Sequence, residues 1–84
     1  ANPQSVKPKL IIGMTWGDFC KRAIKCSTEL DLLCNPFVLV KNGDTRTCPK
    51  YTDIIESNDT ISVIAYNDFD WKKFERRIAL WLLL

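Results

Sequence analysis

The amino-acid sequence predicts an α+β fold in which one main helix crosses a small mixed β-sheet and a second helix follows the last strand. Apolar residues recur at three- and four-residue steps between residues 16 and 30, which is the pattern of an amphipathic helix. Short β-branched runs lie on both sides of that segment and indicate strands. The 84 residues, 46% of them hydrophobic, are enough for one small domain.

The segment before the main helix predicts a single strand. The first eight residues contain two prolines, and we expect them to form a loose lead-in. Residues 9–14 are a short apolar run, which favours a strand. Thr15 then has the position of a helix N-cap, and Asp18 has the position of a capping-box acid. The apolar stripe of the helix that follows comprises Trp16, Phe19, Cys20, Ala23, Ile24, Ser27 and Leu30.

A hairpin and a last strand are predicted after this helix. Asn35-Pro36 ends the helical pattern, and residues 37–40 form a continuous apolar strand. Asn42-Gly43 favours a tight turn, because both residue types readily adopt positive φ angles. The remaining expected elements are a return strand at residues 45–48, a brief helical turn or loop at 51–55 and a last strand at 61–66.

The last predicted element is a C-terminal helix with Asp70 as its N-cap. Its apolar side repeats at helical spacing through Trp71, Phe74, Ile78 and Trp81. Such a helix either folds back on the domain or docks onto another molecule. The order of elements is that of the ubiquitin-like β-grasp, although a β-grasp normally opens with a hairpin. We therefore predict a ubiquitin-like interaction domain at residues 1–70, and at residues 71–84 an amphipathic helix that can begin a following segment.

The charged residues are unevenly distributed along the chain. The net charge of +2 divides into +2 for residues 1–34, −3 for residues 35–70 and +3 for residues 71–84. Such segregation indicates two surface patches of opposite sign, although charges in a small domain also cluster by chance. The small net charge argues against a dedicated nucleic-acid-binding domain, because such domains carry a clear basic excess.

The residue types that most catalytic and metal sites need are scarce. The chain has no histidine, which excludes the commonest general base, the Ser-His and Cys-His nucleophile pairs and the usual metal ligand. Its three glycines form no phosphate-binding loop. The sequence therefore predicts no enzyme, no catalytic residue, no metal site, no cofactor and no small-molecule substrate. The apolar run at residues 78–84 is too short to span a bilayer, which argues against a membrane partner.

The four cysteines leave the compartment open. Cys20, Cys26, Cys34 and Cys48 contain no C-x-x-C spacing, so they do not indicate a zinc site. Reduced thiols would place the protein in the cytoplasm or nucleus, and two disulfides would place it outside the cell. We expect an intracellular protein, with a small secreted disulfide-bonded protein as an alternative.

Most of residues 7–71 resembles the CIDE-N domain, the homotypic module of the caspase-activated DNase, its inhibitor and the CIDE lipid-droplet proteins. The residues that carry the resemblance are the strand at 37–40, the N-G-D-T turn at 42–45, Tyr51, N-D-T at 58–60, the strand at 61–66 and Trp71. Lys7 and Lys9 have the place of the family's basic second strand. The resemblance implies a ubiquitin-like fold and a regulatory domain of a larger protein, for example in apoptotic DNA fragmentation.

The resemblance also implies a mode of binding, because CIDE-N domains join head to tail, basic face to acidic face. The partner would then be a protein with a similar domain, either the same chain or another. The implied basic face comprises Lys7, Lys9, Lys21, Arg22 and Lys25. The implied acidic face comprises Asp44, Asp53, Glu56 and Asp59. The doublecortin microtubule-binding domain is also ubiquitin-like, and it is the alternative in which the bases bind the acidic surface of tubulin.

Overall fold

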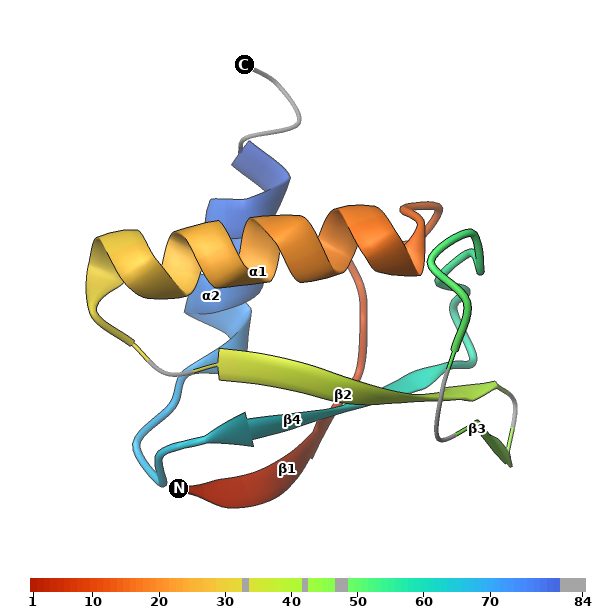
Figure 1. Cartoon of the computed structure of the whole chain (residues 1–84), viewed down its shortest axis with the longest axis horizontal. Coiled ribbons are helices and arrows are strands. Elements are labelled where there is room, and N and C mark those ends of the chain that lie inside the picture. The colour runs from red at the N-terminus through yellow and green to blue at the C-terminus, as the bar shows by residue number, and fades with distance from the viewer. Residues whose placement is uncertain (33, 42, 47–48, 81–84) are drawn as a thin grey trace.

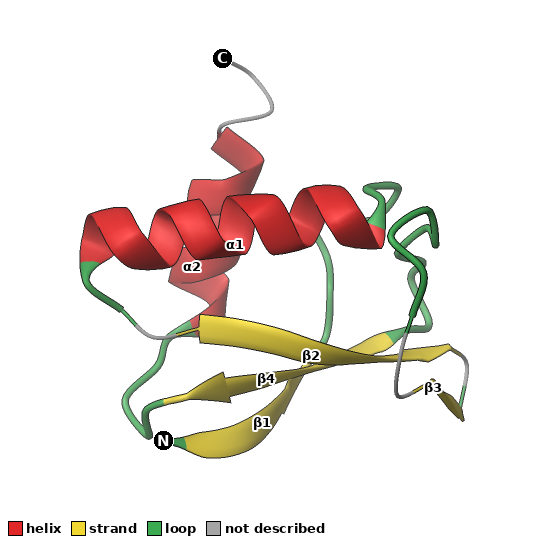
Figure 2. Ribbon diagram, viewed as in Figure 1, coloured by secondary structure: helices red, strands yellow, loops and turns green. Residues whose placement is uncertain are grey.

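The fold is known from a computed structural model, which describes residues 1–32, 34–41, 43–46 and 49–80. Figures 1 and 2 show two layers, with both helices on one side of a β-sheet. This arrangement confirms the predicted α+β class. In chain order the elements are β1 (Asn2–Val6), α1 (Trp16–Leu30), β2 (Cys34–Lys41), β3 (Asp44–Arg46), β4 (Thr60–Ala65) and α2 (Trp71–Leu80).

The sheet has the strand order β1-β4-β2-β3, and every pairing between these strands is antiparallel. The prediction of a mixed sheet is therefore wrong, because the described strands form an antiparallel sheet. The reason is the direction of β1, which pairs antiparallel with β4 from Asn2 opposite Ala65 to Val6 opposite Ile61. The ubiquitin-like topology is not established by this arrangement.

The first strand lies in a different segment from the one predicted. Residues 2–6 form β1, and residues 9–14 form turns instead of a strand. Pro3 is compatible with β1 because β1 is an edge strand, where one missing amide can face away from the sheet. In the predicted strand, Ile11 and Met14 are buried, whereas Leu10 and Ile12 are about half exposed. The two buried residues, Ile11 and Met14, are three positions apart, which does not suit a strand, because the inward side chains of a strand recur every second residue.

The main helix agrees with its prediction at the N-cap and in most of its stripe. Thr15 Oγ1 accepts a hydrogen bond of 3.1 Å from the Asp18 amide, as an N-cap should. The buried side chains of α1 are Trp16, Phe19, Ala23 and Cys26. Ile24 was predicted to be part of the core stripe but is 61% exposed. Cys26 takes its place because the buried side of α1 is turned slightly from the predicted direction.

The hairpin and the last strand lie close to their predicted positions. β2 begins at Cys34, earlier than expected, because a bulge between Pro36 and Val38 accommodates the Asn35-Pro36 pair within the strand. Gly43 has a φ of +92°, in agreement with a glycine-dependent turn. β4 is displaced by one residue from the prediction. Residue 42 of the predicted turn and residues 47 and 48 of the predicted return strand lie outside the described part of the chain.

The second helix folds back onto the same core as the sheet and α1. Phe74 and Ile78 are buried in the cluster that also contains Phe19, and the Phe69 and Phe74 rings meet edge to face at 5.3 Å. Asp70 Oδ1 accepts a hydrogen bond from the Lys73 amide at 3.2 Å, which confirms the predicted cap. Trp81 lies outside the described residues. The division into residues 1–70 and 71–84 stays a prediction.

Candidate protein-interaction surface

An open apolar groove lies where the first half of α1 meets two loops, residues 7–15 and residues 49–59. Its volume is about 1030 Å³. Residues of both loops and of α1 line it. The groove is lined by residues 11–15, Gly17, Asp18, Cys20, Lys21, Ile24, Tyr51 and Thr52.

The shape of the groove depends on how loop 49–59 is attached to the first turn of α1. The first amides of a helix have no partner within the helix. Here the Trp16 amide donates to the Asp53 carbonyl at 2.7 Å, and the Gly17 amide donates to the Tyr51 carbonyl at 2.9 Å. A side chain at Gly17 would place its Cβ 2.9 Å from the Tyr51 Cβ. Only glycine allows the loop to approach α1 so closely, and this approach fixes Tyr51 at the rim.

The groove is apolar and its largest side chains are open to solvent. Ile12 is 46% exposed, Ile24 is 61% exposed and Tyr51 is 74% exposed. Ile24 follows Cys20 by one helical turn, so these two residues continue the apolar stripe of α1 beyond the part that faces the core. A stripe that is wider than the core requires leaves apolar area available to another molecule.

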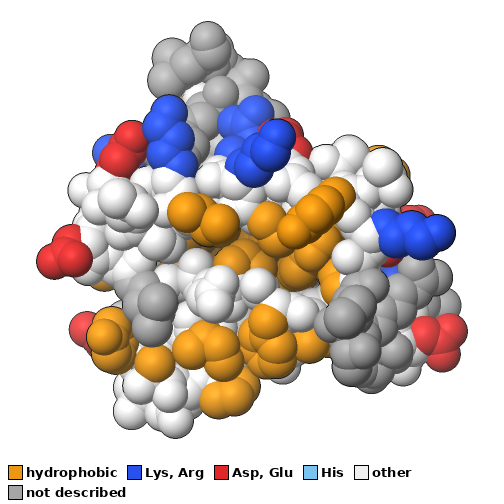
Figure 3. Space-filling view, in the orientation of Figure 1, with side chains coloured by type: hydrophobic (Ala, Val, Ile, Leu, Met, Phe, Trp, Pro, Cys, Tyr) orange, Lys and Arg blue, Asp and Glu red, His pale blue; other side chains and the backbone are white. Residues whose placement is uncertain are grey.

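The charges beside the groove are mainly basic. Asp18 is balanced by Arg22, whose Nε lies 3.2 Å from the Asp18 carboxylate. Lys21 lines the groove and is exposed, and within the described residues it has no carboxylate inside 4 Å. Lys25, one turn further along α1, is also exposed. In Figure 3 hydrophobic side chains gather across the middle of the molecule, and Lys and Arg side chains lie above them.

The helix layer as a whole is basic. α1 and α2 together carry seven of the twelve lysines and arginines of the chain and three acids. One of these acids, Glu75, is buried and does not contribute to the surface. The four bases of α2 are all exposed. The bases of the two helices therefore lie on one layer of the fold, whereas the opposite, acidic patch stays a prediction.

Within the predicted basic face, two lysines belong to loop 7–15. Lys7 and Lys9 are exposed, and α2 holds their backbone. Trp71 Nε1 donates to the Lys7 carbonyl at 2.9 Å, and the Lys9 amide donates to Glu75 Oε2 at 2.7 Å. The Leu10 amide donates to the same oxygen at 2.9 Å.

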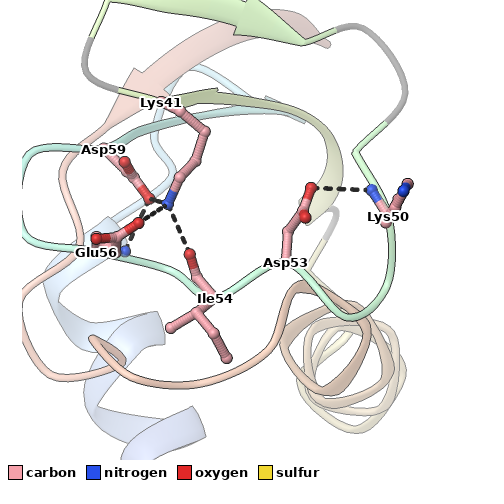
Figure 4. A network of polar contacts seen from close by, with 6 residues as sticks. All are labelled: Lys41, Lys50, Asp53, Ile54, Glu56 and Asp59. Carbon is pink, nitrogen blue, oxygen red and sulfur yellow. Dashed lines mark hydrogen bonds and ion pairs between the residues drawn. The ribbon is translucent and has the colours of Figure 1, made fainter.

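The predicted acidic face contains an internal structural network (Figure 4). Lys41 Nζ donates to the Asp59 carboxylate, to the Ile54 carbonyl at 2.7 Å and to Glu56 Oε1 at 2.7 Å. The Asp59 carboxylate also accepts the Glu56 amide at 2.7 Å. These bonds attach loop 49–59 to the end of β2.

The network corrects one residue of the acidic face. Asp59 is 1% exposed, so its carboxylate cannot meet a partner. Glu56 is exposed but paired with Lys41, and Asp53 accepts a hydrogen bond from the Lys50 amide at 3.1 Å. Asp44 is exposed beside the hairpin turn. The acidic face therefore stays a prediction for the three residues other than Asp59.

Lys41 is held in its charged form. Burial by itself would lower the pKa of the Lys41 ammonium, but the hydrogen bonds and the charges of Asp59 and Glu56 outweigh burial and raise the pKa above its usual value. Lys41 is therefore a permanent cation at neutral pH, and its charge is used within the fold.

The described cysteines behave as small apolar residues. Cys20, Cys26 and Cys34 are free thiols, and Cys48 lies outside the described residues. Burial raises the pKa of Cys20 to about 11 and, with the nearby Cys26, raises the pKa of Cys34 to about 12. These thiols carry almost no thiolate at neutral pH. Among the described residues no group of three or more Cys, Asp or Glu side chains is placed to hold a metal ion.

Some residues of the groove could not be identified from the sequence. Ile24 has the spacing of a core residue, and only the orientation of α1 reveals that it is exposed. Tyr51 reaches the groove because of the glycine at position 17, a contact between segments more than thirty residues apart. One signal in the sequence could have indicated this apolar surface. The apolar stripe of α1 is wider than the core requires, because it includes Cys20 and Ile24.

Comparisons with known proteins add no relative. No protein-family model, no curated protein and no solved structure matches the chain. In the described part of the chain neither helix has the length and hydropathy that crossing a membrane requires.

Proposed function

We propose that this chain is a non-enzymatic protein–protein interaction module that binds an acidic protein partner through α1 and the groove beside it. The observation that carries the proposal is the combination of exposed apolar side chains, Ile12, Ile24 and Tyr51, with an adjacent basic rim. Interfaces of this kind place apolar anchors in the centre and charged residues at the edge.

The two parts of the surface have different roles in binding. Apolar area contributes about 25 cal/mol for each Å² removed from water, so Ile24 and Tyr51 would provide most of the affinity. Exposed lysines such as Lys21 and Lys25 contribute little each, about 0.2–1 kcal/mol, but they orient an acidic partner and accelerate its approach. This second effect weakens with salt.

The finer part of the proposal is the identity of the partner. We propose a similar domain, ubiquitin-like and of the CIDE-N type, in a protein that regulates a larger assembly such as an apoptotic nuclease. Two placements support this head-to-tail association. Lys21 and Lys25 lie on the helix layer, whereas Asp44 and Glu56 are exposed on the hairpin and on loop 49–59. A copy of the fold therefore carries both signs in different regions.

A second candidate, binding to microtubules, is favoured by α2. Its four bases, Lys72, Lys73, Arg76 and Arg77, are all exposed and add to those of α1. Together they suit the acidic surface of tubulin. This candidate uses the charge of the helix layer but does not require the groove.

The test compares groove and charge variants in one binding assay. Binding to a purified CIDE-N domain is measured by light scattering after size exclusion, at low and at high salt. Lys21→Glu/Lys25→Glu should weaken binding at least tenfold and reduce its salt dependence, and Ile24→Asp should weaken it at every salt concentration. Lys50→Glu, an exposed lysine outside the groove, is the matched control.

The outcomes separate the candidates. Loss of binding in both groove and charge variants, with the control intact, supports the proposed module. Co-sedimentation with microtubules that depends on the α2 bases but not on Ile24 would favour the second candidate. Failure to bind either protein would contradict both.

A further inference from the structure

We propose that the outer face of the sheet, the side away from both helices, pairs with a second copy of this chain. The two helices cover only one side of the sheet, and no described element covers the other (Figure 2). This surface is distinct from the groove on α1, so the inference goes beyond the proposed function.

The alternation of β4 identifies the outer face. Ile61, Val63 and Ala65 are buried toward the helices, so Thr60, Ser62 and Ile64 point to the opposite side, where they are partly exposed. Residues directly opposite in neighbouring strands share a face of the sheet. The register therefore adds Asn35, Val38 and Val40 of β2 and Pro3 and Ser5 of β1.

The outer face carries no charged side chain among these eight residues. Charged residues make up 26% of the chain, so about two would be expected if charge were spread evenly. The solvent-facing side of an antiparallel sheet is normally polar and often charged. A sheet face without charges is suited to contact with another protein surface.

The charge distribution indicates that the covering molecule is a second copy. Two copies that faced each other through their helix layers would repel, because each layer carries seven bases against three acids. Pairing the outer faces places these two layers at opposite ends of a dimer. It also joins uncharged surface to uncharged surface, so that no charge is buried without a partner. An acidic or basic partner would find no opposite charge on this face.

The proposed packing is a sandwich of two sheets. Facing sheets lie about 10 Å apart, with side chains from both inner faces interdigitating. On the outer face the large Val38 lies opposite the small Ser62, which in turn lies opposite Ser5. A large residue of one copy can therefore fit beside a small residue of the other. The expected association is weak, because serine and threonine contribute little apolar area.

The test is sedimentation equilibrium of the whole chain over a range of concentrations, at about 0.1 M and about 1 M salt, where the Debye length falls from about 10 Å to about 3 Å. We expect the average mass to rise toward that of a dimer with concentration. The dissociation constant should be unchanged or lower at high salt, because an uncharged interface is not screened and apolar burial is strengthened.

Substitutions separate this surface from the groove. Ile64→Lys and Ser62→Lys should each raise the dimer dissociation constant at least tenfold, because they bring two like charges into the interface. Thr28→Lys, at an exposed position of α1, introduces the same charge and should leave the dimer intact. Circular dichroism verifies that each variant is folded. Ile24→Asp should also dimerise normally, whereas Ile64→Lys should still bind the acidic partner of the proposed function.

Three results would overturn the inference. The first is a monomer at every concentration and salt. The second is a dimer that the folded Ser62→Lys and Ile64→Lys variants leave unchanged. The third is a dimer that dissociates in high salt, which would indicate association through the charged surfaces. The first two results leave the proposed function open, because it is tested with a separate, purified partner domain, whereas the third result would replace the sheet dimer by the head-to-tail association of the proposed function.

Discussion

Loop 7–15 and loop 49–59 perform similar tasks in this fold by different physical means. Both run beside the start of α1, both lack regular strands and both line the groove. Each is held by one buried carboxylate. Asp59, 1% exposed, holds loop 49–59, and Glu75, 3% exposed, holds loop 7–15 from α2.

The partners of the two carboxylates differ. Asp59 accepts the Glu56 amide and also meets the ammonium of Lys41. In the described structure Glu75 accepts only backbone amides, those of Lys9 and Leu10, and both reach the same oxygen. The charge of the carboxylate is therefore needed at Asp59, where a cation is buried beside it. At Glu75 the essential property is an oxygen that accepts two hydrogen bonds.

Substitution of Asp59 should have the largest effect on stability. Asp59→Ala leaves the Lys41 ammonium, 15% exposed, without its closest counter-charge and should destabilise the fold by about 3 kcal/mol. Asp59→Asn should lose nearly as much, because the amide keeps an acceptor but not the charge. Urea unfolding followed by tryptophan fluorescence measures both. An Asn variant as stable as the original chain would contradict the role of the ion pair.

At Glu75, unlike at Asp59, the alanine variant and the neutral, isosteric variant should differ clearly in stability. Glu75→Ala leaves two backbone amides without an acceptor and should cost about 2 kcal/mol. Glu75→Gln retains an oxygen in the same place and should cost less than about 1 kcal/mol. The same unfolding experiment applies. Equal losses for Gln and Ala would mean that the negative charge matters at this site too.

The attachment of loop 49–59 to α1 can be tested at the glycine. Gly17→Ala places a methyl group 2.9 Å from the Tyr51 Cβ and should destabilise by about 1–2 kcal/mol. Thr28→Ala, at an exposed position of the same helix, serves as the control. Because the loop must move away from α1, the variant should also bind the acidic partner more weakly. A Gly17→Ala chain of unchanged stability would show that the loop is not tightly attached.

The smallest effect is a dependence on alkaline pH. The folded pKa of Lys41 is raised, so its contribution to stability is complete below its unfolded pKa, about 10.4. That contribution is lost as pH rises through the higher folded pKa. The stability difference between the original chain and Lys41→Met should therefore be constant up to about pH 10 and shrink above it. A difference that is already smaller at pH 8 than at pH 6 would be inconsistent with this ion pair.

The features predicted correctly are those determined by residues close together in the chain. Thr15 caps α1 through a bond to a residue three positions away, and Gly43 makes its turn through its own φ. β1 could not be predicted, because its partners are residues 61–65. The same holds for the residues of the groove. Lys21 was correctly expected at the surface of α1 from the local pattern, whereas the position of Tyr51 depends on a contact with a distant segment. Asp59 was taken for a surface acid because nothing near it in the sequence reveals Lys41.

The pairing of β1 with β4 has a consequence for how the chain folds during synthesis. The first strand has no partner until residues 61–65 have left the ribosome, and loop 7–10 has no anchor on α2 until Trp71 and Glu75 follow. Closing so long a loop is entropically costly, and sheets built from distant pairings form slowly. We therefore expect α1 and the β2–β3 hairpin to appear early on the nascent chain. The cooperative fold can form only after α2 has emerged, and until then the apolar face of the sheet remains accessible to chaperones.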